Sequence, residues 1–291
     1  MTGDVLPSSM LISACFAFNK RLMKELNKTE PYSLVREGKW TLDEFNAMTK
    51  DVTVDVDGDG VIDYKKENHL TKDLYVAILL GDEATAAKIS GIEHPKVLKT
   101  TAEDNIFLYY IDHGGDNIVA MPEGGYLTAE TLVGTIKKMY ENKMYNKLVY
   151  YLEACESGSM WQTLPKDINA YALSSTLPDE SSWGTYCPPE DDIVDGEHIG
   201  SCLGEVWSCF WLEQDDTADL KTLTLQKQFD DAKAFTTTSH PLQFGDMEIA
   251  KDVLVNYISG DVSRRKFLRS ENRRPSNWNS RDNELLFWKY Q

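Results

Sequence analysis

The sequence predicts an α/β fold in which a mainly parallel sheet is flanked by helices. Two apolar runs, NIFLYYI at 105–111 and KLVYYLE at 147–153, are typical of buried strands. Between them, residues 128–143 carry apolar side chains at the spacing of one helix face. A strand, a helix and a second strand in this order indicate parallel pairing through a right-handed crossover.

The other elements follow from weaker patterns. We expect a helix from Thr71 to Leu80, ended by Gly81. The turn after the first strand is Asp112-His113-Gly114-Gly115-Asp116. The remaining expectations are a short strand at 169–175, a loop at 176–200, helices at 203–212 and 218–234, a strand or edge segment at 247–257, and a linker or docking arm from residue 263.

Length and composition narrow the class of protein. The 291 residues suit one large domain or two small ones, and 42% of them are hydrophobic. A formal charge of −17 argues against binding to nucleic acid and to an anionic membrane surface. Five cysteines without a CxxC motif make a zinc ribbon unlikely and leave one thiol free unless it pairs between chains.

The first 70 residues contain two ambiguous segments. Residues 5–18 are mildly apolar, but the chain opens with MTGD rather than with a basic stretch, so a signal peptide is not evident. Residues 55–63, DVDGDGVID, match an EF-hand loop up to its ninth position, yet Lys66 occupies the twelfth, where a carboxylate belongs. Both a solvated acidic turn and a weak calcium site remain open for this loop.

The chemistry is expected where the two buried strands end. His113 follows the first strand and Cys155 follows the second, so parallel pairing brings both to one edge of the sheet. An imidazole beside a thiol stabilises the thiolate and can later protonate a leaving amine. The backbone N–H groups of Gly114 and Cys155 could hold an oxyanion. Alternatively, the cysteine is a buried small side chain and the histidine a solvated turn residue.

Glu153 lies two residues before Cys155 and therefore on the same face of the strand. A carboxylate disfavours ionisation of a neighbouring thiol, which a protein would tolerate if the carboxylate reads the substrate. An acceptor in a small pocket suits the NH2 group of an Asn side chain. A simple salt bridge is the alternative.

Several segments resemble the legumain family, the asparaginyl endopeptidases. They include YYIDHGGDNIVAMP at 109–122 and KMYNKLVYYLEACESGSMW at 143–161. The other matching segments lie at 59–82, 164–184, 202–216, 239–246 and 280–290. The combination of DHG with EACESGS is highly specific, and the resemblance spans residues 53–260 plus the extreme C-terminus.

The resemblance implies a caspase-like three-layer sandwich that cuts after Asn, and after Asp at lower pH. It implies that Cys155 is the nucleophile, that His113 is its partner, and that Gly114 with Cys155 holds the oxyanion. No cofactor or metal is implied.

The resemblance also implies residues for the substrate site. Glu153 would line the specificity pocket, and Glu205 falls where the family usually has Asp at the pocket floor. Ser181 and Ser182 fall where the family lines the substrate cleft. Asp112 precedes His113 as it does in the family.

The sequence departs from the family at both ends. Legumains begin with a strand and an Asn-x-Arg-His motif, whose Asn orients the catalytic His and whose Arg binds the substrate side chain. Here Asn19 and Arg21 have the right mutual spacing, but the His is missing. The helical C-terminal prodomain is also missing. We therefore divide the chain into a divergent segment 1–52, a peptidase domain 53–260 and a tail 261–291.

The sequence thus predicts a cysteine endopeptidase that acts on proteins or peptides. The family resemblance implies a lysosomal or vacuolar location. The alternative is a catalytically impaired or truncated paralogue that only binds peptides.

Overall fold

The computed structural model describes residues 70–122, 125–194, 196–258 and 275–279. The chain divides into two compact units, Met1–Asn68 and His69–Gln291, and all described residues belong to the second unit. The expectations for residues 5–18, for Asn19 and Arg21, and for the acidic loop 55–66 therefore lie outside the described residues.

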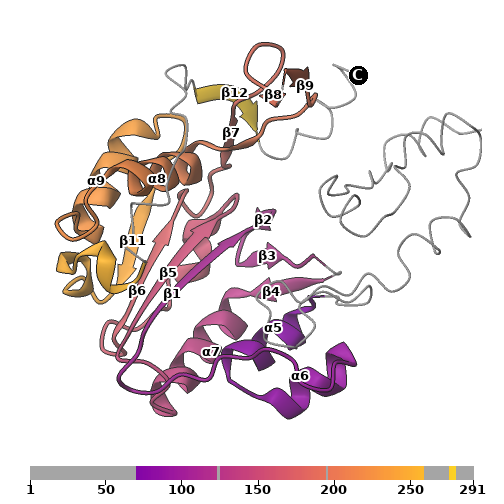
Figure 1. The fold of residues 1–291 in the computed structure, drawn as a ribbon, viewed down its shortest axis with the longest axis vertical. Helices are drawn as coiled ribbons and strands as arrows, with labels where there is room; N and C mark the ends of the chain where they lie inside the picture. Colours follow the sequence, from indigo (N-terminus) through magenta and orange to yellow (C-terminus); the bar gives the residue numbers. More distant parts are fainter. Residues whose placement is uncertain (1–69, 123–124, 195, 259–274, 280–291) are drawn as a thin grey trace, which may run out of the picture. The chain divides into compact units, whose positions relative to one another are not determined.

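The second unit is built on a four-stranded sheet with the order β1-β5-β6-β11 (Figure 1). Its strands are β1 (Asn105–Ile111), β5 (Lys147–Glu153), β6 (Ala170–Ser174) and β11 (Leu242–Gly245). The first three are parallel, and β11 is antiparallel to β6. The prediction of a mainly parallel sheet is confirmed. Because Ile111 pairs with Glu153, β1 and β5 end side by side.

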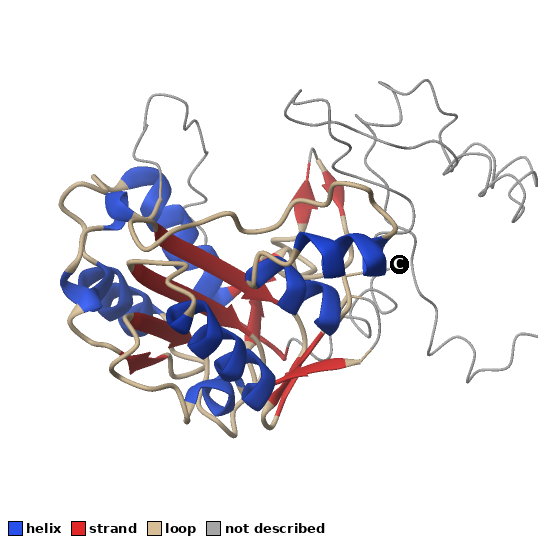
Figure 2. Cartoon of the chain, turned by 90° about the horizontal axis from the view of Figure 1, so that it is seen from below, coloured by secondary structure: helices blue, strands red, loops and turns tan. Residues whose placement is uncertain are grey.

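Helices cover both faces of this sheet (Figure 2). One face carries α7 (Ala129–Glu141) together with α5 (Lys72–Leu79), beside which α6 (Glu83–Ser90) packs. The other face carries α8 (Val206–Thr217) and α9 (Leu225–Phe235). The result is the expected three-layer sandwich.

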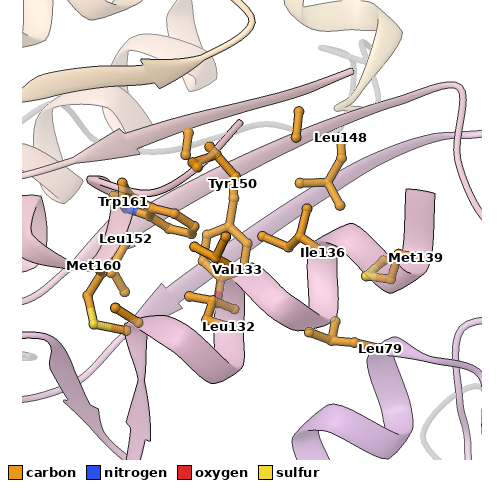
Figure 3. Close-up of a cluster of buried hydrophobic side chains, with 14 of the residues drawn as sticks. Leu79, Leu132, Val133, Ile136, Met139, Leu148, Tyr150, Leu152, Met160 and Trp161 are labelled. Atoms are coloured by element: carbon orange, nitrogen blue, oxygen red, sulfur yellow. The ribbon is translucent and has the colours of Figure 1, made fainter. Parts of the chain in front are cut away.

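The central strand β5 shows how the sequence supports two cores. Leu148, Tyr150 and Leu152 lie in the cluster under α7 (Figure 3), while Val149 and Tyr151 lie in the cluster under α8 and α9. Side chains of a strand alternate between faces, so a strand buried on both faces reads as a continuous apolar run.

Threonine caps begin three of the helices. The Thr128 side chain accepts the Thr131 N–H at the start of α7, and Thr71 and Thr224 cap α5 and α9 in the same way. These caps satisfy N–H groups that have no partner within the helix. The expected helices at 71–80 and 128–143 are confirmed. The other two are α8, which is shifted a few residues toward the C-terminus, and α9, which begins seven residues later than predicted and ends close to the predicted end.

Small strands surround the carboxyl edge of the main sheet. One sheet has the order β2-β3-β4, formed by β2 (Gly114–Gly115), β3 (Ile118–Ala120) and β4 (Tyr126–Thr128). Another has the order β10-β7-β12, formed by β10 (Gly204–Glu205), β7 (Trp183–Thr185) and β12 (Pro275–Asn279). A hairpin of β8 (Ile193–Val194) and β9 (Glu197–His198) follows β7. The prediction of a loop at 176–200 missed these short strands. β7 pairs with β10 and β12, which are farther along the chain, while β8 and β9 pair with each other.

The expected strand at 247–257 was also wrong. This segment forms two short 3-10 helices, η2 (Ile249–Lys251) and η3 (Leu254–Asn256). The Asp246 side chain accepts the Glu248 N–H and so starts a turn rather than a strand. Ile249, Ala250 and Leu254 of this segment are buried in the core under α9, which explains the misleading pattern. Throughout the described residues, no helix is long and apolar enough to cross a membrane.

Candidate active site

The carboxyl ends of β1 and β5 bring His113 and Cys155 together at the level of the backbone. The Asp112 N–H donates to the Glu153 carbonyl at 3.3 Å, which extends the ladder beyond both strands. Gly114 then lies directly against Cys155, since a Cβ added to Gly114 would fall 2.0 Å from the Cys155 carbonyl oxygen. This contact requires a residue without a side chain at position 114.

Cys155 occupies a sharp turn between β5 and the 3-10 helix η1 (Ser157–Trp161). The next residue, Glu156, has a left-handed backbone with φ of 51°, which is unusual outside glycine. The Cys155 side chain is buried, with 1% of its surface exposed. The Ser182 N–H donates to its Sγ at 3.4 Å, and the Ser182 Oγ lies 3.6 Å from it.

His113 is exposed on the β1 side of the same edge. Its N–H donates to Asp112 Oδ1 at 2.7 Å, and its carbonyl accepts the Ala120 N–H at 2.8 Å. Within the described residues, the hydrogen bonds of the Cys155 Sγ go to Ser182 and Asn279. Pairing of the imidazole with the thiol therefore stays a proposal.

Glu153 is a buried carboxyl group with 1% exposure. The Ser208 N–H and Oγ donate to its Oε2 at 3.1 and 2.8 Å. Burial raises the pKa of Glu153 to about 8, and the nearby charge of Glu205 adds to this increase against the opposing effect of the serine hydrogen bonds. The group is therefore largely neutral at acidic pH.

Glu205 stands where β10 meets α8, as the residue that precedes the first turn of the helix. It pairs with Gly184 of β7, two residues after Ser182. The electrostatic coupling between Glu205 and Glu153 places both carboxyl groups in one region. Ser181 is half-buried just before Ser182. The residues expected to line a substrate site thus gather around β7 and the end of β5.

A tail segment that the sequence had indicated only as a linker or docking arm also reaches this region. β12 pairs antiparallel with β7, with Asn279 opposite Trp183 (Figure 1). The Asn279 Oδ1 lies 4.0 Å from the Cys155 Sγ. Nothing in the sequence around Asn279 signals this contact, because it joins residues 124 positions apart.

Glu180 is a second residue that the sequence pattern did not reveal. Its backbone carbonyl accepts the Glu156 N–H at 2.7 Å, next to Cys155. Its carboxylate accepts the backbone N–H groups of Leu177 and His240 and lies 2.7 Å from His240 Nδ1. Glu180 thereby ties the turn after the thiol to the segment before β11.

A disulfide between Cys187 and Cys202 closes the loop that carries β8 and β9. Gly184 permits this packing, since a Cβ there would lie 2.8 Å from the Cys202 Sγ. Inside the loop, burial raises the pKa of Asp192, but hydrogen bonds from His198 and the Gly200 N–H outweigh burial and hold that pKa below its usual value. Across the described residues, no three His, Cys, Asp or Glu side chains gather as a metal site would require.

Comparison with known proteins gives a consistent result. The model of the peptidase C13 family matches residues 45–261. Vacuolar-processing enzyme delta-isozyme from Arabidopsis thaliana is 39% identical over 215 residues, covering 72% of this chain and 45% of that protein. Legumain from Mus musculus is 42% identical over 189 residues, covering 65% of this chain and 40% of that protein.

The chain spans less than half the length of these curated relatives. Among solved structures, caspase-1 from Spodoptera frugiperda matches with a TM-score of 0.38 at 9% identity, over 61% of this chain and 68% of that one.

Proposed function

Because the chain belongs to the peptidase C13 family, we propose that it is a cysteine endopeptidase that cleaves proteins or peptides after Asn through Cys155 and His113. The peptidase domain spans residues 53–260 in this proposal, between the segment 1–52 and the tail 261–291. The site needs no cofactor for this chemistry.

The contact of Asn279 carries the proposed Asn preference. An Asn side chain lies against the Cys155 thiol on an extended segment that pairs antiparallel with β7. Strand addition of this kind is a common way to bind an extended peptide, because the backbone supplies affinity and side-chain pockets supply selectivity. The contact joins the thiol to the side-chain oxygen of Asn279 and not to its backbone carbonyl. It therefore supports the proposal that an extended segment with an Asn side chain can reach the thiol, without itself being a cleavage geometry.

The proposed reaction uses these groups in turn. His113 takes the thiol proton as the Cys155 sulfur attacks the backbone carbonyl carbon of the substrate Asn. The N–H groups of Gly114 and Cys155 stabilise the oxyanion that forms. His113 then donates its proton to the leaving amine, and a thioester remains on Cys155. A water molecule, deprotonated by His113, hydrolyses the thioester and frees the acid product.

Glu153 and Glu205 supply a means of reading the substrate side chain. A neutral Glu153 can donate to the oxygen of an Asn amide, while an ionised Glu205 can accept from its NH2 group. An ionised Asp side chain has no N–H or O–H to donate to Glu205. Glu205 and the Asp can share a hydrogen bond only when one of the two carboxyl groups is protonated. This explains why cleavage after Asp is expected only at lower pH.

The disulfide of the β8–β9 loop supports a location outside the reducing cytosol. Together with relatives that are named vacuolar-processing enzymes, it supports a vacuolar or lysosomal location. The substrates would then be proteins delivered to that compartment.

The test measures cleavage of fluorogenic peptides that end in Asn, Asp, Gln, Lys or Leu, from pH 4.5 to pH 7.5. We expect Asn-selective turnover by the full chain and none by Cys155→Ala. Cys209→Ala is the matched control, since Cys209 is the other cysteine of the described residues that lies outside the disulfide. Circular dichroism checks that all three proteins fold.

Intact mass of the chain provides a second readout. If Asn279 binds as a substrate residue, the wild-type chain cuts itself after Asn279, and neither Cys155→Ala nor Asn279→Gln does. Folded protein without turnover in either assay would refute the enzyme proposal and favour the peptide-binding paralogue. Turnover that does not prefer Asn would refute the proposed pocket alone.

A further inference from the structure

Two turns carry the groups that the proposed function requires, and each contains an unusual residue. The nucleophile turn, residues 154–157, includes Glu156 with φ of 51°. The histidine hairpin, residues 113–120, includes Asn117 with φ of 58°. Non-glycine residues keep a left-handed backbone only where surrounding contacts enforce it, so a contact should hold both turns.

Ser159 makes that contact with one side chain. Its Oγ donates to the Glu156 carbonyl at 2.7 Å and accepts the Asn117 N–H at 2.7 Å. The Gly115 carbonyl lies at 3.5 Å, too far to compete for the single hydroxyl proton. With 2% of its surface exposed, Ser159 forms these bonds where water has little access.

The bond between Ser159 and Asn117 joins positions 42 residues apart. On one side of Ser159, Glu156 directly follows Cys155. On the other side, Asn117 belongs to the same two-stranded turn as Gly114 and Gly115, which directly follow His113. The Ser159 hydroxyl is therefore a hydrogen-bonded link between the backbone that carries the thiol and the backbone that carries the imidazole.

We propose that Ser159 is a positioning residue that sets the separation between the His113 imidazole and the Cys155 thiol. This inference rests on the proposed function of these two groups. Ser159 touches neither reacting group and acts only through the two turns. Loss of its hydroxyl removes this link while the Asp112–Glu153 backbone bond remains. The histidine hairpin is then held less firmly against the nucleophile turn, so the imidazole assists the thiol less.

Ser157 offers a matched control. It lies two residues away in the same 3-10 helix and is fully buried. Its Oγ lies 3.3 Å from the Ser175 Oγ and 3.0 Å from the Thr176 Oγ1, not in contact with the histidine hairpin. Ser157→Ala and Ser159→Ala therefore remove the same group from similar surroundings, and only the second breaks the link.

The experiment measures the alkylation rate of Cys155 by iodoacetamide across pH, followed by mass spectrometry of the peptide that contains Cys155. Wild type should show an inflection that His113→Ala removes. Ser159→Ala should weaken or shift that inflection and lower kcat at least tenfold while KM changes less than twofold. Ser157→Ala lies in the nucleophile turn and can change the absolute rate, but it should keep the inflection that depends on His113, because the link from Ser159 to the histidine hairpin is intact. Ser159→Gly, which also lacks the hydroxyl and adds no second thiol to the alkylated peptide, replaces Ser159→Ala if the latter does not fold.

The double variant His113→Ala/Ser159→Ala decides how Ser159 acts. If Ser159 works through His113, its removal has no further effect on alkylation once His113 is gone. Additive effects, or a Ser159→Ala profile equal to that of Ser157→Ala, would overturn the inference alone. If His113→Ala has the same pH profile of Cys155 alkylation as the wild type, the proposed dyad is overturned, and the inference with it.

Discussion

Gly114 is the position in the candidate site where a side chain has the least room. A Cβ at this position would lie 2.0 Å from the Cys155 carbonyl oxygen and 2.9 Å from the Ala154 Cβ. Both neighbours belong to the rigid end of a central strand, so neither can move aside cheaply. The proposed role of Gly114 in holding the oxyanion rests on the same close approach.

We therefore predict that Gly114→Ala abolishes peptide cleavage and lowers the free energy of unfolding by about 1–3 kcal/mol through overpacking. Gly134→Ala is the control, since it lies in α7 with no atom within 4 Å of the added Cβ. That change should stabilise the protein by about 0.5–1 kcal/mol. Peptide turnover and urea unfolding give both values, and an active Gly114→Ala protein would contradict the proposed oxyanion site.

Glu153 makes the stability of the fold depend on pH. Its pKa is about 8 in the folded protein, against 4.5 for an ordinary Glu. Between these values the folded state holds a proton that the unfolded state has released, so stability falls as pH rises. The stability that Glu153 contributes is fully present below pH 4.5 and is lost as pH rises through 8.

We predict that Glu153→Gln raises the free energy of unfolding at pH 7.5 by roughly 2–4 kcal/mol, and the Tm with it. At pH 4.5 both quantities should change little. The comparison is made in a Cys155→Ala background, which removes self-cleavage. Calorimetry at the two pH values gives the result. An equal shift at both would show that ionisation of Glu153 is not the cause.

At the residue scale, the sequence predicted the residues that border a recognisable strand. His113, Gly114, Glu153 and Cys155 were found in this way. Ser159, Glu180 and Asn279 were missed because their decisive contacts span 42, 60 and 124 positions. Such contacts depend on how loops fold back, which no local pattern encodes.

At the scale of elements, the loop before β7 is held by Glu180. Its carboxylate, whose side chain is 19% exposed, accepts two backbone N–H groups and pairs with the His240 ring. The same loop presents Ser182 to the Cys155 thiol. The loop therefore connects the segment before β11 to the Cys155 thiol, the proposed nucleophile.

We predict that Glu180→Ala lowers kcat at least tenfold and the free energy of unfolding by about 1–3 kcal/mol, because two N–H groups lose their acceptor. Glu190→Ala, at an exposed position, should change neither quantity measurably. Peptide turnover and denaturant unfolding test both variants. Wild-type kcat in a folded Glu180→Ala protein would show that the loop does not need this anchor.

The predictions of elements were correct where burial alone determines the secondary structure. They were wrong where the secondary structure depends on which strand a segment pairs with. β5 was predicted correctly because a strand covered by helices on both faces is apolar throughout. β11 was missed because its four residues sit at a sheet edge and end at Gly245, whose φ of 81° bends the chain. Residues 247–257 misled because a segment packed under a helix can be as apolar as a strand.

At the scale of the whole molecule, one sheet joins two cores. The helices α7 and α9 pack on opposite faces of it, and their residues Ile136 and Leu225 are both fully buried. Because β5 contributes side chains to both clusters, loss of either core removes support from the other. The described unit should therefore unfold in one step.

We predict that Ile136→Ala and Leu225→Ala each cost about 2–5 kcal/mol and shift a single unfolding transition. Hydrogen exchange of the β5 amides should accelerate in both variants by a similar factor. Two separate transitions, or protection of β5 that survives one of the substitutions, would show that the cores fold independently.

The architecture of the whole molecule was the most predictable level. A strand, helix and strand in sequence leave few topologies for a right-handed crossover, and the specific motifs at the strand ends pointed to the legumain resemblance that the family comparison confirmed. The exact partner of each short strand at the rim could not follow from these rules, since the rim contributes little apolar area.

The covalent attachment of β12 has a consequence for the affinity of the site for other peptides. A strand that is covalently attached to the unit it pairs with meets its binding site at an effective concentration on the order of millimolar. If peptides bind where β12 pairs, as proposed, a free peptide competes with this occupant, and its apparent affinity is multiplied by the fraction of time that β12 is undocked. Dilution does not relieve the competition, because the local concentration is set by the chain between Ile258 and Pro275. Only cutting that chain returns the strand to bulk solution and leaves the site to external peptides.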